Sequence, residues 1–246
     1  MSALPILCFH NVAPAPADAR FKLLYVSPDR FERQLWMLRR VGLRGVCASE
    51  GLARLRAGTS RGCVVLTFDD GYADALTVAA PLMKRYGCRA TCYVVGGALG
   101  TYNRWDAQLL GEKKPVMSRE QLAEWLAAGM EVGSHSWSHP QLHQLPEQAA
   151  WYEIAESRAA LGTMLGVPIE HFAYPYGHYT PQTLELVRRA GYRSAVTALP
   201  GVARSSDDCL LLPRILVNGE HALWRFLLRL VASYARRRVP TSLGSA

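Results

Sequence analysis

Residues 64–75, VVLTFDDGYADA, place two adjacent carboxylates at the end of an apolar run. The apolar run at 64–68 predicts a buried strand, and Gly71 is typical of the turn that ends such a strand. Two like charges repel strongly at the mouth of a buried strand, where the dielectric constant is low. Asp69 and Asp70 therefore require a compensating positive charge, most simply a metal cation.

Length and composition restrict the class of protein. The chain has 246 residues, of which 50% are hydrophobic, so it can bury the core of one large α/β domain or of two small ones. No apolar run approaches the roughly 18 residues of a membrane span. We predict one domain over residues 1–238, followed by a flexible tail over residues 239–246.

The cysteines and the N-terminal segment indicate the compartment. Only Cys88 and Cys92 lie close together, and they lack the second pair that a zinc ribbon needs, so all six cysteines are expected to be reduced core residues. The segment MSALPILCFHNVAPAP has no basic region before its short apolar stretch, which favours a first strand over a signal peptide. We therefore expect a cytoplasmic protein.

Short apolar runs alternate with helical patterns along the chain. PILCFH, GCVVLTFDDG, RATCYVVGG, EVGSHSW, HFAYPYG and SAVTAL are predicted strands. Ser27, Ser118 and Thr180 mark helix starts, and glycines such as Gly42 and Gly166 mark helix ends. Strands and helices alternating at this spacing predict a parallel sheet, closed or open.

Residues 133–140, GSHSWSHP, carry two histidines four positions apart after another predicted strand. This spacing lets His135 and His139 converge on one ion from a tight loop or a turn of helix. Because an α/β protein collects its site at the carboxyl ends of parallel strands, we expect these histidines to meet Asp69 and Asp70. One aspartate and two histidines leave positions open for water and substrate. That set suits Zn²⁺ or another divalent first-row ion such as Co²⁺, Ni²⁺, Mn²⁺ or Fe²⁺.

Residues 172–180, FAYPYGHYT, follow a further predicted strand. Pro175 beside Gly177 fixes a rigid turn, and such a turn can aim a backbone N–H into a cavity as an oxyanion donor. The alternative interpretation is an ordinary turn at a strand end.

The motifs TFDDGYAD, SHSWSHP and FAYPYG, in this order and spacing, resemble the first three motifs of the polysaccharide deacetylase family. This family is the NodB-homology group, also called carbohydrate esterase family 4. The similarity includes the flanking segments and extends from residue 5 to residue 232. It implies a single-domain α/β fold, a distorted (β/α)7-type barrel rather than a complete eightfold one.

The resemblance also implies a role for each motif residue. Asp69 resembles the general base that activates the attacking water, and Asp70, His135 and His139 resemble the metal ligands. The backbone N–H of Tyr176 resembles the oxyanion donor. In this scheme the metal neutralises one carboxylate, and its neighbour is free to take a proton from the water.

The third motif departs from the commonest pattern of the family. It usually begins with an arginine that tunes the base, and Tyr174 stands at that position here. In this respect the chain is similar to the subgroup that acts on poly-N-acetylglucosamine and related cell-surface glycans. Arg214, in LLPRILV, is predicted to supply the missing cation, the alternative being a surface or interface arginine.

The general acid is the second departure, because the late L-x-H motif that provides it in the family is replaced by LVN at residues 216–218. His221 is one candidate acid, and a solvated histidine at a helix N-terminus is the alternative. His10, at the end of CFH, is a rival that is expected to line the pocket. Metal polarisation with a proton from solvent is a third option.

Further substrate contacts are expected from the long loop 96–115 and from the third motif. Trp105 and Asp106 are expected to stack on a sugar ring and hydrogen-bond it, the alternative being that Trp105 anchors the loop. Tyr174 and Pro175 are expected to border the substrate.

The net charge of +8 is concentrated near the C-terminus, where residues 225–238 hold five arginines and no acid. Aromatic and basic residues do not alternate around a groove-sized patch, so nucleic acid is not expected as a partner. On a helical wheel Arg225, Arg229, Ser233 and Arg236 form one stripe. The segment is interpreted as the last helix packing on the sheet with its arginines reaching solvent, or as a basic helix resting on anionic lipid.

Together these features predict a metal-dependent N-deacetylase that hydrolyses the acetamide of N-acetylhexosamine units in a glycan such as poly- or oligo-N-acetylglucosamine. A glycan attached to a lipid carrier at the inner face of the membrane would be within reach of a cytoplasmic enzyme. The alternatives are a deformylase or deacetylase of one lipid-linked amino sugar, and a carbohydrate-binding pseudoenzyme. No oligomeric state is assigned.

Overall fold

The computed structural model describes residues 2–235 of the chain. The predicted tail over residues 239–246 and the arginines at positions 236–238 lie outside the described residues. Within the described range, strands alternate with helices along most of the chain, as the sequence pattern predicts.

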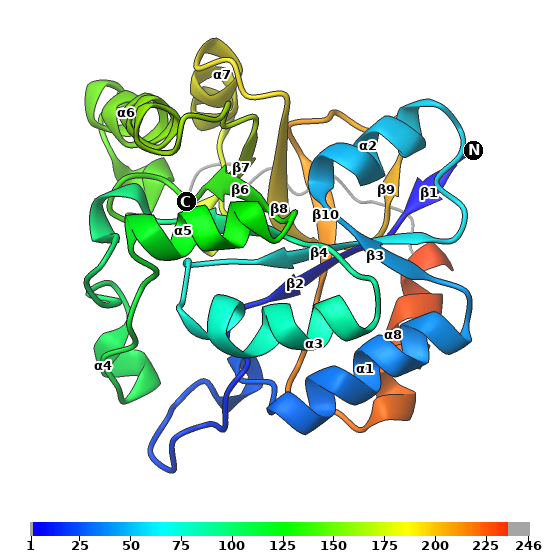
Figure 1. Ribbon diagram of the computed structural model, residues 1–246. Helices are drawn as coiled ribbons and strands as arrows, with labels where there is room; N and C mark the ends of the chain where they lie inside the picture. The colour runs from blue at the N-terminus through cyan, green and yellow to red at the C-terminus, as the bar shows by residue number, and fades with distance from the viewer. Residues whose placement is uncertain (1, 236–246) are drawn as a thin grey trace.

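Seven parallel strands close into a barrel at the centre of the protein (Figure 1). Each strand pairs with the next, and β4 pairs with β2 to complete the ring. The prediction of a distorted (β/α)7-type barrel is therefore confirmed. In ring order the strands are β2 (Ile6–Phe9), β10 (Leu212–Leu216), β8 (Ser194–Pro200), β7 (His171–Ala173), β6 (Glu131–Ser134), β5 (Thr91–Val94) and β4 (Cys63–Phe68).

Two smaller pairings lie at the amino-terminal end of the barrel. β3 (Arg44–Val46) pairs with the first half of β4. β5 pairs with the last residues of β4 along the same edge of that strand. β1 (Ala3–Leu4) and β9 (Ala203–Arg204) form an antiparallel pair. Leu4 and Ala203 belong to the same apolar cluster as the barrel interior, so this pair closes that end of the barrel.

Helices surround the barrel (Figure 1). α1 packs against α3 and α8, and α6 packs against α5 and α7. Short helical turns complete the connections. The helices are α1 (Pro28–Arg40), α2 (Ala48–Arg56), α3 (Ala80–Arg85), α4 (Ala107–Leu110), α5 (Arg119–Ala127), α6 (Glu147–Leu165), α7 (Pro181–Arg189) and α8 (Leu223–Ala235), with the turns η1 (Lys22–Leu24), η2 (Ala75–Ala79), η3 (Gly96–Ala98), η4 (Leu142–Gln144) and η5 (Pro175–Gly177).

The predicted helix starts are present. The Ser27 hydroxyl accepts a hydrogen bond from the Arg30 N–H at the start of α1. Ser118 and Thr180 form capping boxes at the starts of α5 and α7. Each cap satisfies backbone N–H groups that have no partner inside the helix. These local signals therefore fix where the helices begin, and with them the lengths of the loops at the strand ends.

The core has two layers because side chains alternate along each strand. On β4, Val65 belongs to the cluster inside the barrel, whereas Val64, Leu66 and Phe68 belong to the cluster under the helices. Every residue of β4 is buried, as its apolar run predicts. The aspartates that follow are thus attached to a rigid, fully covered strand.

All six cysteines are free, as predicted, and five of them are buried. Among the described residues, no helix combines the length and the apolar character needed to cross a membrane.

The aromatic cluster under the helices gives a stability prediction. The ring of Phe68 packs against Phe9, Phe31 and Trp125, with centroids 5.4, 5.9 and 6.1 Å away. Because Phe68→Ala opens a cavity there, it should lower the free energy of unfolding by roughly 3–5 kcal/mol in urea titrations. Phe21→Ala is the control, since Phe21 is exposed. Equal losses from the two variants would contradict this packing.

Candidate active site

A cavity of about 440 Å³ lies at the carboxyl ends of the barrel strands. We call it the main cavity. Asp69 and Asp70 reach it from the end of β4, His135 and His139 from the end of β6, and Tyr176 from the turn after β7. The structure therefore brings these sequence-predicted residues together. The remaining wall of the main cavity is largely apolar and includes Phe21, Leu23, Leu24, Leu109, Leu110 and Leu216.

Asp70, His135 and His139 form one cluster of metal-ligand type. One donor atom from each lies within 4.8 Å of the others. Asp70 Oδ1 is 3.7 Å from His135 Nε2 and 3.4 Å from His139 Nε2. His135 Nδ1–H donates to the carbonyl of Ala173 at 2.8 Å, which leaves the lone pair of Nε2 directed into the cluster.

The electrostatics of this cluster fit a divalent cation. Burial raises the pKa of Asp70 well above its usual value, and the charges of Asp106 and Asp69 raise it further. Burial also lowers the pKa of His135 and of His139, which keeps both imidazoles neutral and able to donate lone pairs. A divalent cation would neutralise the buried carboxylate and accept the lone pairs of both imidazoles. The donor set therefore suits Zn²⁺ or a similar ion.

Backbone strain is concentrated in this site. Among the described residues, four other than glycine have φ in the left-handed region: Asp70, Ser136, His139 and Tyr176. All four stand in the three motifs of the sequence. Left-handed backbone is costly for such residues and persists where the surrounding structure imposes it, most often at functional sites. The motifs are therefore held in unusual conformations that aim their side chains.

Glu153 on α6 fixes the histidine loop, and the sequence analysis did not identify it. Its carboxylate accepts hydrogen bonds from the backbone N–H groups of Trp137 and Ser138 and from the Ser138 hydroxyl. The Ser136 hydroxyl accepts from the His139 N–H at 2.9 Å. The sequence gives no signal for this role, because Glu153 is one of several acids along a helical pattern and its burial is known only from the structure.

Asp69 has a partner that Asp70 lacks, the guanidinium of Arg214. Its two carboxylate oxygens accept hydrogen bonds from Nη1 and Nη2 of Arg214, each at 2.7 Å. Both side chains are buried. Burial alone raises the pKa of Asp69, but the charge of Arg214, with a smaller effect of His135, holds that pKa well below its usual value. Asp69 is therefore an ionised carboxylate in a closed environment.

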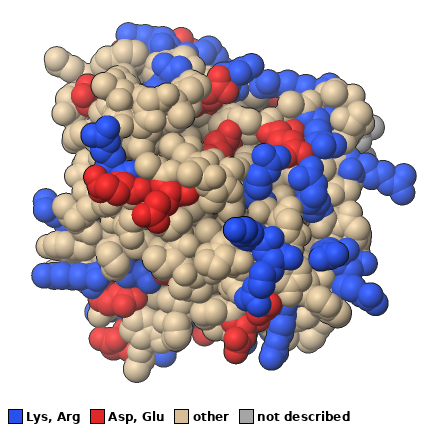
Figure 2. Space-filling model, in the orientation of Figure 1, with Lys and Arg blue, Asp and Glu red and all other residues tan. Residues whose placement is uncertain are grey.

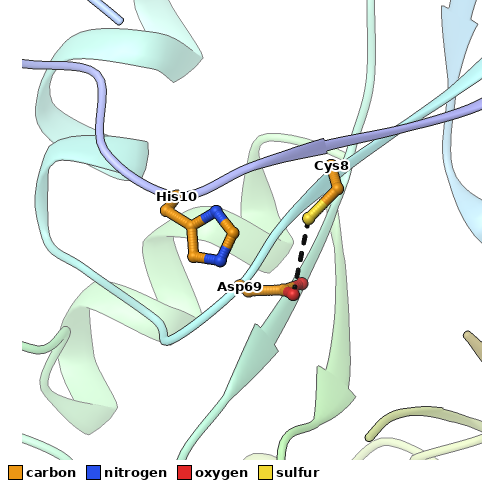
Figure 3. A group of neighbouring side chains, drawn as sticks. All are labelled: Cys8, His10 and Asp69. Atoms are coloured by element: carbon orange, nitrogen blue, oxygen red, sulfur yellow. Dashed lines mark hydrogen bonds between the residues drawn. The ribbon is translucent and has the colours of Figure 1, made fainter. Parts of the chain in front are cut away.

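Cys8 on β2 and His10, the residue that follows β2, also point toward Asp69 (Figure 3). Cys8 Sγ lies 3.5 Å from Asp69 Oδ2, and the three residues form a second cluster of metal-ligand type. This cluster is a poor cation site, because both oxygens of its only carboxylate already bind the positively charged guanidinium of Arg214. Burial lowers the pKa of His10 to about 4, so its ring is neutral near pH 7.

The loop between β5 and α5 covers one side of the site. The Trp105 ring stacks on His139 with centroids 5.2 Å apart, and on Tyr72 with centroids 6.4 Å apart. Asp106 accepts hydrogen bonds from the Tyr72 hydroxyl at 2.9 Å and from the Asn103 amide at 2.6 Å. Trp105 and Asp106 line the main cavity, and the ring contacts of Trp105 anchor the loop. Their contact with a sugar stays a prediction.

The turn after β7 carries Tyr176 with φ 59°. Its ring meets His139 edge to face, with centroids 4.6 Å apart, and remains half-exposed. The next residue, Gly177, lies against β8, where an added Cβ would stand 2.1 Å from the Cβ of Ala198. Only glycine fits there, so this close contact positions the turn at the wall of the main cavity.

Tyr174 and Pro175 do not border the cavity, which corrects the expectation from the sequence. Tyr174 is fully buried and packs against Phe172 in the layer under the helices, because residues 172 and 174 share one face of β7. Ala173 faces the barrel interior. An arginine at position 174 would therefore point away from Asp69, and the position on this strand that faces the interior is 173.

His221 is not among the residues that line the main cavity. It lies beside a small hollow with Phe226 and Arg229 on α8. The physical reason is that the chain turns back after β10, where the Gly219 N–H donates to the carbonyl of Leu23. The candidate acid from the sequence is thus displaced from the reacting groups, whereas the rival His10 does line the cavity.

Residues 56–195, more than half of the chain, match the family model described as polysaccharide deacetylase. The chain belongs to the polysaccharide deacetylase family. The resemblance that the sequence motifs indicated is confirmed.

Individual relatives extend this similarity beyond the family model. YxkH of Bacillus subtilis strain 168, named as a polysaccharide deacetylase, is 29% identical over 217 residues, which are 87% of this chain and 71% of that protein. The poly-beta-1,6-N-acetyl-D-glucosamine N-deacetylase of Escherichia coli K12 is 27% identical over 92% of this chain, but this chain spans only 38% of its length. The solved structure of the Streptococcus pyogenes deacetylase PplD in complex with acetate superposes with a TM-score of 0.79 at 27% identity, covering 92% of this chain and 97% of that one.

The ligand assignment predicts distinct effects for the two neighbouring aspartates. Asp70→Ala, His135→Ala and His139→Ala should each weaken Zn²⁺ binding by at least about tenfold in calorimetric titrations, because each removes one of three donors. Asp69→Asn is the matched control and should bind Zn²⁺ nearly as the wild type does. Loss of the metal in Asp69→Asn with retention in Asp70→Ala would reverse the assignment.

Proposed function

We propose that this polysaccharide deacetylase is a divalent-metal-dependent N-deacetylase that hydrolyses the acetamide of N-acetylhexosamine units in a glycan. One observation carries the proposal. The ionised carboxylate of Asp69, paired with Arg214, adjoins a three-residue cluster that fits a divalent cation, and both face one cavity. An ionised base beside a metal site is the arrangement that metal-assisted amide hydrolysis uses.

The names of two relatives support the choice of substrate. The Escherichia coli relative is named for deacetylating poly-beta-1,6-N-acetyl-D-glucosamine, and a relative from Azorhizobium caulinodans is named a chitooligosaccharide deacetylase. Both names specify an N-acetylated glucosamine polymer or oligomer. We propose the same class of acetamide for this chain, with acetate and a free amine as products.

In this proposal Asp69 is the general base, and three other residues are the metal ligands. A divalent ion bound by Asp70, His135 and His139 would supply Lewis-acid chemistry, polarising the acetamide carbonyl and acidifying water. Asp69 takes the proton from the water that attacks the acetyl carbon. Arg214 keeps this carboxylate ionised, so that it is available as a base near pH 7.

Two further groups assist the attack of water and the departure of the amine. The backbone N–H of Tyr176, on the left-handed turn at the cavity wall, is the proposed donor to the carbonyl oxygen as negative charge develops there. His10 is the proposed proton relay to the leaving nitrogen. It lines the cavity within reach of Asp69, and its buried Nδ1 has no hydrogen-bond partner among the described residues. A neutral imidazole can accept a proton at one nitrogen while it donates from the other.

The direct test is to incubate the purified protein and Zn²⁺ with chitooligosaccharides and to follow acetate release together with product masses. We expect loss of acetyl groups and appearance of free amines. Asp69→Asn should release acetate at least about 100-fold more slowly, since general base catalysis contributes that much or more. A protein that binds the oligosaccharides and releases no acetate with any first-row metal would instead be a binding pseudoenzyme.

The ion pair predicts a shift in the pH–rate profile. Arg214→Met removes the charge that lowers the pKa of Asp69, so that pKa should rise. The base is then protonated at a higher pH, and the acid limb of kcat/KM should move upward by at least about one pH unit, with a lower kcat. Arg193→Met, which breaks a surface pair with Glu170, is the control and should leave the profile unchanged. An unmoved acid limb in Arg214→Met would leave Arg214 a purely structural role.

A further inference from the structure

The last helix presents an apolar face to solvent. Trp224, Leu228 and Val231, at positions i, i+4 and i+7 of α8, are 58, 57 and 63% exposed. The opposite face of the same helix is buried through Phe226 and Leu230, which belong to the apolar core. A helix that packs on its own domain needs only one apolar face, so this second face lacks a partner within the described residues. We call these three residues the outer face of α8.

Positive charge adjoins the outer face. Arg225 and Arg229, also four positions apart, are exposed beside it. The sequence of α8 contains no aspartate or glutamate. In the view of Figure 2, Lys and Arg side chains gather on the right-hand half, the side on which α1 and α8 lie in Figure 1. An apolar stripe flanked by arginines, with a tryptophan near one end and a tyrosine near the other, is typical of helices that lie in a membrane interface.

Exposed apolar side chains also lie at the mouth of the main cavity. Leu216 lines the main cavity at the end of β10, the strand against which α8 packs. Phe21, Leu109 and Leu216, all in the wall of the main cavity, are themselves 43, 39 and 37% exposed. Exposed apolar side chains are therefore present both at the mouth of the cavity and on the outer face of α8.

We propose that this surface binds an anionic lipid bilayer and that the N-acetylated amino sugar reaches the main cavity while attached to a lipid in that bilayer. The inference rests on the proposed function for its chemistry, and it adds the substrate class. A bilayer fits better than a second copy of this chain, because a self-complementary contact through α8 offers no acid to the arginines. Anionic headgroups supply the missing counter-charge, and acyl chains cover the apolar face.

The test measures binding to phosphatidylcholine vesicles with and without phosphatidylglycerol by co-sedimentation. Trp224→Ser/Leu228→Ser should weaken binding to the anionic vesicles by about 30-fold, which corresponds to roughly 2 kcal/mol. Arg225→Gln/Arg229→Gln should weaken it by a similar factor at low salt and by much less at high salt. The matched control is Trp36→Ser/Tyr152→Ser, since these exposed aromatics lie on α1 and α6. It should bind as the wild type does.

A second readout separates this inference from the proposed function. Acetate release from soluble chitooligosaccharides should be unchanged in Trp224→Ser/Leu228→Ser, because neither side chain lines the main cavity. Release from an N-acetylglucosaminyl lipid embedded in anionic vesicles should fall by about the factor lost in binding. Equal vesicle binding by the wild type and this variant overturns the inference. The inference is also overturned if the wild type does not bind the vesicles and forms a dimer that the variant does not form. Failure to release acetate from any substrate would overturn the proposed function while leaving the vesicle measurement valid.

Discussion

The bidentate pair between Asp69 and Arg214 is the interaction on which the site depends. The two residues lie 145 positions apart in the chain and meet because β2 pairs with β4 on one side and with β10 on the other. Closing the barrel therefore creates the pair. Removing one member of a buried, hydrogen-bonded ion pair leaves an uncompensated charge and costs roughly 3–5 kcal/mol. The catalytic electrostatics and the closure of the barrel are thus linked.

The pair also explains how two adjacent acids acquire opposite properties. Asp69 is paired with a guanidinium and stays ionised. Asp70 has a left-handed backbone conformation and faces two neutral imidazoles, so a cation is still needed to balance its negative charge. A strand places successive side chains on opposite faces, and a left-handed backbone changes that direction again. The sequence Asp-Asp-Gly can therefore direct one carboxylate toward β10 and the other toward β6.

Much of this was predictable from the sequence, and the failures have physical causes. Short motifs with fixed spacing predicted the cluster of Asp69, Asp70, His135 and His139, because strand ends in a parallel barrel must meet. Tyr174 was assigned to the wrong face, since a shift of one residue along a strand reverses the direction of the side chain. The position of His221 depended on where the chain turns after β10. That turn is fixed by long-range hydrogen bonds, which no local pattern reveals.

The location of a bound ion tests the account most directly, because the described residues include two clusters of metal-ligand type, one of which contains Asp69 itself. A crystal grown with Zn²⁺, with anomalous scattering recorded at the zinc edge, would place the ion without reference to activity. The account predicts zinc among Asp70, His135 and His139, with Asp69 still paired to Arg214. Zinc bound instead by Cys8, His10 and Asp69, with Arg214 displaced, would contradict it.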